Sequence, residues 1–150
     1  MDVAAALWAG IIGAIAAALV YLGFMALGWT RLDLLRFEGG LLMRERTGMV
    51  YVYGGVLQVA AGCLLALLYR AVFQQLSAAT FVGWGALLGL AQGVLALLAL
   101  PLLGLVNRNV RAGDEPRPGF AGFAYGPLTP VALLVASVVF GLWVGLVLLP

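Results

Sequence analysis

Few side chains in this sequence could perform covalent chemistry, and the residues that would have to assist them are missing. The candidate nucleophiles are Cys63, Ser77, Thr80 and Ser137. A hydroxyl or thiol nucleophile needs an adjacent base, and the sequence contains no histidine, which is the usual base near neutral pH. The carboxylates are confined to Asp2 and to two charged segments, 30–48 and 107–130. We therefore predict no catalytic residue and no enzymatic activity, and we interpret Cys63 and Ser137 as helix-packing residues.

The sequence also shows neither the ligand pattern of a metal site nor the charge of a nucleic-acid-binding surface. Asp114 and Glu115 are adjacent carboxylates in the segment GDEPRPG, whose glycines and prolines are typical of turns. Two acidic side chains without histidine or further acidic ligands do not predict a metal site. The net charge of +2 is small and resides in the charged segments, which argues against a nucleic-acid partner. We predict no metal, no cofactor-binding residue and no nucleic-acid partner, while a bound lipid or pigment is compatible with the sequence.

Gln58 and Gln92 are the only strongly polar side chains deep within the apolar segments. An unpaired amide in hydrocarbon costs several kcal/mol, so each should face protein rather than lipid. Their expected partners are each other, Ser137 or backbone carbonyl groups. Two interpretations stay open: hydrogen bonds that hold helices together, and polar contacts in a substrate or cofactor cavity.

The elements that carry these residues are apolar segments long enough to cross a membrane. The chain is 65% hydrophobic and 9% charged, whereas soluble domains carry about 25% charged residues. Spans of about 20 residues or more are predicted at 4–28, 50–70, 81–105 and 129–149. They lack the polar alternation of barrel strands, and the first is too long, and lacks the basic start, for a signal peptide. We predict an all-α, polytopic integral membrane protein whose residues 1–150 form one transmembrane domain, a bundle of four helices.

Every predicted span carries small residues at a spacing of four, which is typical of helices that pack closely in lipid. The expected packing positions are Gly10, Ala14, Gly54, Gly62, Gly85, Gly89, Gly93, Ser137, Gly141 and Gly145. Apolar burial drives little association in lipid because the acyl chains are equally apolar, so close backbone contact must do so. Pro101 is expected to bend or end the third span, because proline cannot donate a helical hydrogen bond.

The distribution of arginine predicts the orientation of the chain. Seven arginines lie in the connections 29–49 and 106–128, and only Arg70 lies on the opposite side. Positive charge near the ends of spans remains cytoplasmic, so both connections should be cytoplasmic and both termini outside. Aromatic residues near the ends of the spans, Tyr69 and Tyr125 among them, are interpreted as interfacial anchors.

The first connection contains the segment LDLLRFEGGLL. Thr30 is expected to cap a short helix, with Asp33 three residues further on, and Gly39-Gly40 is expected to end it. Apolar side chains such as Phe37 are interleaved with charges, which predicts a segment lying at the lipid boundary. Its arginines would contact lipid headgroups or, alternatively, a partner subunit; they are Arg31, Arg36, Arg44 and Arg46.

The two halves of the chain show a weak correspondence. Gln58-x3-Gly62 and Ser137-x3-Gly141 occupy similar places in the second helix of each half. This pattern is compatible with a two-plus-two duplication of helix hairpins in parallel orientation.

The whole chain also resembles a known kind of protein. The succession of LDLLRFEGGLL, GGVLQVAAGCLLALLY, GALLGLAQGVLALLALP and FAYGPLTPVALLVASVVFGLWVG resembles small, uncharacterised, loosely YagU-like prokaryotic membrane proteins. The resemblance implies a four-helix bundle in the inner (cytoplasmic) membrane of a prokaryote, with no established activity. It also implies that histidines of the relatives are replaced here by Gln58, Gln92 and Ser137, so histidine ligation is lost.

Two functions are compatible with these expectations. The first is a non-catalytic accessory or scaffolding subunit of a larger membrane complex of respiratory or photosynthetic type, acting through helix packing and lipid or pigment contacts with other transmembrane subunits. The alternative is a small oligomeric transporter or channel for neutral or lipid-like solutes. Transport of charged solutes usually requires ionisable groups inside the spans, and the predicted spans contain none in their interiors.

Overall fold

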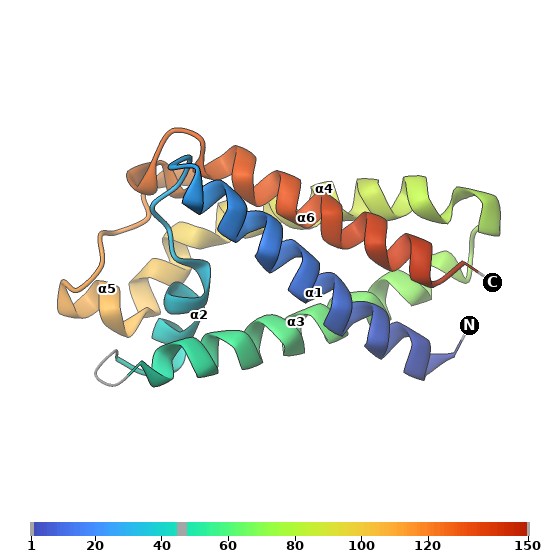
Figure 1. Ribbon diagram of the computed structural model, residues 1–150, viewed down its shortest axis with the longest axis horizontal. Helices are drawn as coiled ribbons and strands as arrows, with labels where there is room; N and C mark the ends of the chain where they lie inside the picture. Colours follow the sequence, from blue (N-terminus) through green and yellow to red (C-terminus); the bar gives the residue numbers. More distant parts are fainter. Residues whose placement is uncertain (1, 45–47, 150) are drawn as a thin grey trace.

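The computed structural model describes residues 2–44 and 48–149 (Figure 1). Its four long helices are apolar enough to cross a membrane: α1 (Val3–Ala26), α3 (Met49–Phe73), α4 (Phe81–Val106, preceded by the 3-10 turn η1, Ala78–Thr80) and α6 (Thr129–Val147). All regular secondary structure in the described residues is helical. The prediction of an all-α protein with four spanning helices is confirmed.

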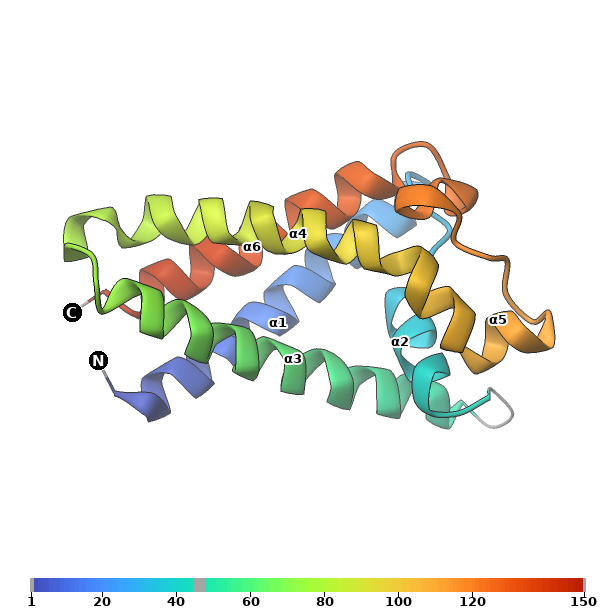
Figure 2. The same ribbon diagram turned by 180° about the vertical axis from the view of Figure 1, so that it is seen from behind.

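Three short elements fill the two longer connections. They are α2 (Leu34–Leu42), α5 (Arg108–Ala112) and the 3-10 segment η2 (Phe120–Tyr125). Both connections lie at the same end of the molecule, whereas the two termini and the α3–α4 connection lie at the other (Figures 1 and 2). The chain therefore crosses from end to end four times.

The details predicted for α2 are wrong at both of its ends. Its cap is the Asp33 carboxylate, which accepts from the backbone N–H of Arg36 at 3.2 Å. Thr30 is instead buried, with its hydroxyl 2.8 Å from the hydroxyl of Thr129. Gly39 and Gly40 do not end the helix, because both are needed inside it: a Cβ on Gly39 would collide with the carbonyl group of Val50 at the start of α3.

The long helices pack in the order α4–α6–α1–α3, and the two ends of this row barely touch each other. Figure 2 shows α3 and α4 in front, with α1 and α6 crossing behind them. Helix α2 packs against α3 and α5 at the end where the long connections lie. The result is a curved row of helices that is open on the side between α3 and α4.

Small residues lie where the long helices cross. A Cβ on Gly10 of α1 would lie 2.6 Å from the carbonyl oxygen of Gly62 on α3. On the α4–α6 crossing, Gly85 lies against Gly141. The other predicted packing positions in these two helices also make close contacts, pairing Gly89 and Gly93 with Ser137, and Gly145 with Phe81. Backbone contact at these crossings is the kind of packing that holds helices together in lipid.

Two positions behave differently from the expected pattern. Gly54 packs against the backbone of Leu35, so it receives the short helix α2 and not another span. Helix α4 continues through Pro101 to Val106, so the proline does not end the span. Proline removes one backbone donor, which a helix tolerates in a membrane when neighbouring groups compensate.

The two hairpins α1–α3 and α4–α6 each close on small residues, as a two-plus-two arrangement would require. A parallel repeat would also make the α1–α6 and α4–α3 contacts equivalent. The first is extensive and the second is nearly absent. The fold therefore departs from a repeat at the open side, which is where the cavity described next is found.

Candidate functional site

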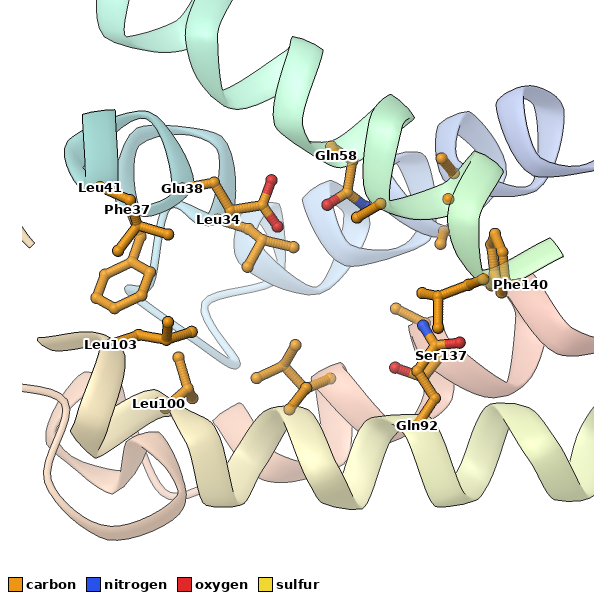
Figure 3. A pocket seen from close by; sticks show the side chains of 18 residues that line it. Leu34, Phe37, Glu38, Leu41, Gln58, Gln92, Leu100, Leu103, Ser137 and Phe140 are labelled. Carbon is orange, nitrogen blue, oxygen red and sulfur yellow. The ribbon is translucent and has the colours of Figure 1, made fainter. Parts of the chain in front are cut away.

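A cavity of about 230 Å³ lies inside the curved row of helices (Figure 3). Five helices contribute to its wall, and most of the wall is apolar. The lining residues are Ala14, Ala17, Leu34, Phe37, Glu38, Leu41, Gln58, Ala61, Gly62, Leu65, Gln92, Ala96, Leu100, Leu103, Leu133, Ala136, Ser137 and Phe140. The only polar side chains among them belong to Glu38, Gln58, Gln92 and Ser137. An apolar hollow with a few convergent polar groups is the usual form of a small-molecule site.

Helix α2 carries Glu38 into this cavity. Phe37 and Leu41 line the cavity beside it, and Gly39 and Gly54 let α2 approach α3 closely. The carboxyl group and the amide of Gln58 are directed toward each other (Figure 3). With its amide nitrogen turned to the carboxylate, Gln58 donates to Oε1 at 2.6 Å and to Oε2 at 3.0 Å. The segment predicted to lie at the lipid boundary thus brings a carboxylate to the wall of the cavity.

Burial makes Glu38 an unusually weak acid. Removal from water disfavours the charged carboxylate and raises the pKa of Glu38 to about 8. The side chain is only half-buried by surface area because the cavity itself is open, but protein surrounds it on most sides. Glu115, at the same end of the molecule, contrasts with Glu38 because it lies 3.1 Å from the Arg36 guanidinium.

Gln92 lies across the cavity and is satisfied by a different partner. The hydroxyl of Tyr69 on α3 donates to its Oε1 at 2.7 Å. This contact is the direct polar link between α3 and α4, the two helices that otherwise hardly touch. Tyr69 is 4% exposed, so its interpretation as an interfacial anchor is wrong. The same holds for Tyr125, which is buried and donates to the carbonyl oxygen of Pro116 at 2.8 Å.

The partners expected for the two glutamines therefore differ from the observed ones. Each amide faces protein, as predicted, but the partners are Glu38 and Tyr69. Ser137 lines the same cavity and also receives Gly89 and Gly93 at the α4–α6 crossing. Ser137 therefore packs at the helix crossing, as expected, and also lines the cavity, which was not expected.

Buried hydrogen bonds hold α2 in place beside the cavity. Asn107 is fully buried, and its amide nitrogen donates to the carbonyl oxygen of Phe37 at 2.7 Å. Its Oδ1 accepts from the backbone N–H groups of Asn109 and Val110 and so caps α5. One side chain therefore fixes the relative positions of α2, α4 and α5.

Ion pairs join the two long connections at the end of the molecule that carries α2 and α5. Arg44 makes a two-pronged contact with Asp114, at 2.7 and 3.2 Å, and Arg36 lies 3.1 Å from Glu115. The guanidinium of Arg44 lowers the pKa of Asp114 below its usual value. Asp114 and Glu115 thus face arginines. Contact of these arginines with headgroups or a partner remains a prediction, and Arg46 lies outside the described residues.

Two of the candidate nucleophiles, Cys63 and Thr80, contact backbone carbonyl groups. The Cys63 thiol is 3.7 Å from the carbonyl oxygen of Leu7, and the Thr80 hydroxyl donates to the carbonyl oxygen of Ser77 at 2.8 Å. Among the described residues, no group of three or more histidine, cysteine, aspartate or glutamate side chains is placed to hold a metal ion.

Sequence reasoning missed two residues of the site: Glu38, which lines the cavity, and Tyr69, which donates to Gln92 of the cavity wall. Glu38 was assigned to a boundary segment because its neighbours in the sequence are charged. Glu38 shares a helix face with the apolar residues Leu34 and Leu41, but a helix on the lipid surface also has an apolar face, so this pattern did not distinguish the two positions. Tyr69 gave no distinguishing signal, because tyrosine at the end of a span is typical of an anchor.

No family model, no curated protein and no solved structure matches this chain. The resemblance to YagU-like proteins therefore stays an expectation, and the function has to be argued from the cavity.

Proposed function

We propose that this protein is a non-catalytic, membrane-embedded binding protein that carries a small amphiphilic, lipid-like solute in its central cavity. The observation that carries the proposal is the cavity itself, with apolar walls from five helices and four polar side chains. Gln92 and Ser137 lie near the middles of α4 and α6, so the hollow reaches the middle of the membrane. A solute there would be shielded from lipid on the α1 and α6 side.

The open side between α3 and α4 supports entry of the solute from the lipid. These two helices make few contacts with each other, and Gln58 and Gln92 are only half-buried between them. A solute with an apolar body could enter sideways without crossing the charged end of the molecule. This route is compatible with the transporter alternative drawn from the sequence.

Photolabelling in lipid nanodiscs tests the proposal. The probe is a long-chain neutral alcohol that carries a diazirine, and the labelled residues are mapped by mass spectrometry. We expect labelling concentrated on cavity residues such as Leu65 and Leu100. The variant Ala96→Phe, which fills the cavity from α4, should reduce this labelling at least fivefold.

The matched control is Ala91→Phe, because Ala91 is exposed on the same helix and does not line the cavity. It should leave the labelling pattern unchanged. Labelling spread evenly over the outer surfaces of the helices, with no difference between the two variants, would contradict a binding cavity.

A second candidate is the accessory subunit predicted from the sequence. The observation that favours it is the same open side, because a neighbouring subunit seated between α3 and α4 would also cover the half-buried glutamines. Native gel electrophoresis in mild detergent separates the two. Migration as a lone species of 15.7 kDa that still binds the probe would count against an obligatory partner.

The cellular setting belongs to the same proposal. We infer a location in a prokaryotic cytoplasmic membrane, with both termini outside and the connections that carry α2 and α5 in the cytoplasm. The supporting observation is that these connections lie together at one end and carry seven of the eight basic residues.

A further inference from the structure

Within residues 2–44 and 48–149, Glu38 is a carboxylate without a cationic partner, and the cavity that it lines is otherwise apolar or neutral. Among the residues that line the cavity, it is the only titratable one. Burying a carboxylate costs far more than a neutral amide can return, so the group must either keep its proton or acquire a cation. Which of the two occurs depends on what occupies the space beside it.

In the part of the chain that the structure describes, the charged groups near Glu38 have other partners or are exposed. On α2 itself, Arg36 lies 3.1 Å from Glu115, and Asp33 caps the helix. On α5, Arg108 and Arg111 are exposed. On α3, the neutral Gln58 faces the carboxylate. The titratable residues of α3 lie elsewhere: Cys63 contacts Leu7 and Tyr69 contacts Gln92, Tyr51 and Tyr53 are exposed, and Arg70 is in the last turn of the helix. Helices α4 and α6 contain no titratable residue, and α1 contains only Tyr21, whose hydroxyl is 3.2 Å from that of Thr30.

Gln58 suits both states of the carboxyl group. An amide has a donor and an acceptor, and it exchanges them by turning over. Its nitrogen donates to both oxygens of the ionised carboxylate. Turned the other way, its oxygen accepts from the protonated acid. The pair can therefore gain and lose a proton without leaving a buried polar atom unsatisfied.

The size of the cavity limits the ligand. An apolar cavity of about 150 Å³ is large enough to hold benzene, and this one measures about 230 Å³. An aromatic ring with a compact headgroup would fit, with the ring against Leu65, Leu100 and Phe140 and the head beside Glu38. A longer tail would extend between α3 and α4.

We propose that the solute is a monocationic amphiphile, an ammonium compound with a small aromatic or alkyl body, and that its charge pairs with Glu38 in exchange for a proton. This inference rests on the proposed function, since it names the class of solute that the cavity takes. The protonated acid gives up its O–H proton to water, and the carboxylate then pairs with the cation. One positive charge leaves the cavity as one enters, and no covalent bond to the solute is made or broken.

This exchange makes binding dependent on pH. With burial raising the pKa of Glu38 to about 8, the ionised fraction is about fifty times larger at pH 8 than at pH 6. A permanently charged ligand should bind more tightly at pH 8 by about that factor. Near pH 7 about one proton should be released for each ligand bound.

The experiment uses a pair of probes with the same shape. Benzyltrimethylammonium carries a permanent charge, and neopentylbenzene replaces its nitrogen by carbon. Binding of each to the full chain in nanodiscs is measured from pH 6 to pH 9, and proton release is recorded in weak buffer. We expect the cation alone to show the fifty-fold dependence on pH and the release of a proton.

Variants assign the effect to one carboxylate. Glu38→Gln should weaken binding of the cation at least tenfold at pH 8 and abolish proton release. Asp114→Asn removes a carboxylate from the same end of the molecule but outside the cavity, and it should change neither. If Glu38→Gln does not fold, Glu38→Asp should retain proton release, and the comparison of the two probes on the unaltered protein needs no variant.

The failures of the two proposals are distinguishable. If the cation binds equally at pH 6 and pH 8, or releases no proton, the exchange at Glu38 is wrong. If neopentylbenzene is then still displaced by Ala96→Phe but not by Ala91→Phe, the cavity binds a neutral solute and the proposed function survives. If neither probe distinguishes these two alanine variants, both proposals fail.

Discussion

The roles of the polar residues in this protein are set by hydrogen-bond partners that are distant in the sequence. Glu38 and Gln58 are twenty residues apart in number but belong to different elements, and their contact turns a charged loop residue into part of a membrane cavity. Tyr69 and Gln92 form a second contact between different elements, across the open side between α3 and α4. At this scale, each hydrogen bond can be tested by removing one group.

Glu38 should make the stability of the protein depend on pH. Its pKa rises from 4.5 to about 8 on folding, so between these values the folded state holds a proton that the unfolded state has released. The free energy of unfolding should therefore decrease as pH rises from about 4.5 to about 8, and then level off. Asp114, whose pKa is lowered by Arg44, titrates below this window.

Denaturant titrations in mixed micelles from pH 5 to pH 9 measure this effect. In Glu38→Gln the decrease should be smaller than in the unaltered protein. A difference between the two proteins that does not vary with pH would show that Glu38 is not protonated on folding.

Tyr69→Phe should destabilise the protein modestly. It removes the O–H that donates to Gln92 but keeps the ring against Phe73 and Phe140. Bonds of this kind between membrane helices contribute about 0.6 to 2 kcal/mol, and we expect a loss of that size. A double-mutant cycle with Gln92→Leu checks it, since purely additive effects would mean that the two groups are not coupled.

At the scale of elements, helices are held by backbone contact at a few small residues. Glycine is required at these positions because a side chain would occupy the space of the neighbouring backbone, and not because of its flexibility. Other glycines in the same helices face open space. The two kinds are therefore distinguishable by the same substitution.

Gly62→Ala and Gly55→Ala should have opposite effects. Both residues lie in the interior of α3, but a Cβ on Gly62 would lie 2.7 Å from the carbonyl oxygen of Gly10, whereas nothing lies within 4 Å of one on Gly55. Overpacking costs about 1–3 kcal/mol, and replacing a glycine in the interior of a helix by alanine gains up to about 1 kcal/mol. Thermal unfolding in detergent measures both, and equal effects would refute close packing at the α1–α3 crossing.

Asn107→Ala should loosen α2. The substitution removes the side-chain donor that joins Asn107 to the carbonyl of Phe37, and it leaves the buried N–H groups of Asn109 and Val110 without the acceptor that caps α5. An unsatisfied buried group costs about 1–3 kcal/mol, so a loss in this range or above it is expected. Hydrogen exchange should show faster exchange in α2 but not at the α4–α6 crossing. Uniform acceleration through the whole chain would mean that α2 is not a separate unit.

At the scale of the molecule, the charges and the ends of the helices define two different sides. The end with α2, α5 and η2 carries the ion pairs that join the long connections, and the other end carries both termini. The cavity opens sideways between α3 and α4, between these two ends.

Cysteine labelling tests the orientation in the membrane. In a Cys63→Ala background, Ser77→Cys should react in intact cells with a maleimide that does not cross membranes. Arg111→Cys, which is exposed at the opposite end, should react only after the cells are opened. The reverse result would place the termini in the cytoplasm and contradict the arginine distribution as a guide.

The sequence predicted much of the architecture and little of the cavity. Spans are local properties, since about 20 consecutive apolar residues suffice to define one, and small residues at a spacing of four lie on one helix face by geometry alone. The depth of Glu38 and its contact with Gln58 depend on how α2 folds back, and the partner of Gln92 depends on where α3 lies relative to α4. The local pattern of alternating apolar and charged residues is equally compatible with a helix on the lipid surface.

By itself the sequence determined that the chain forms four membrane-spanning helices and where its small residues are, because length, hydropathy and periodicity act within each segment. Only the tertiary structure decided that α3 and α4 stay apart and that α2 enters the space behind them. Those outcomes depend on contacts between segments, such as Asn107 with Phe37 and Gly54 with Leu35, which no single segment encodes.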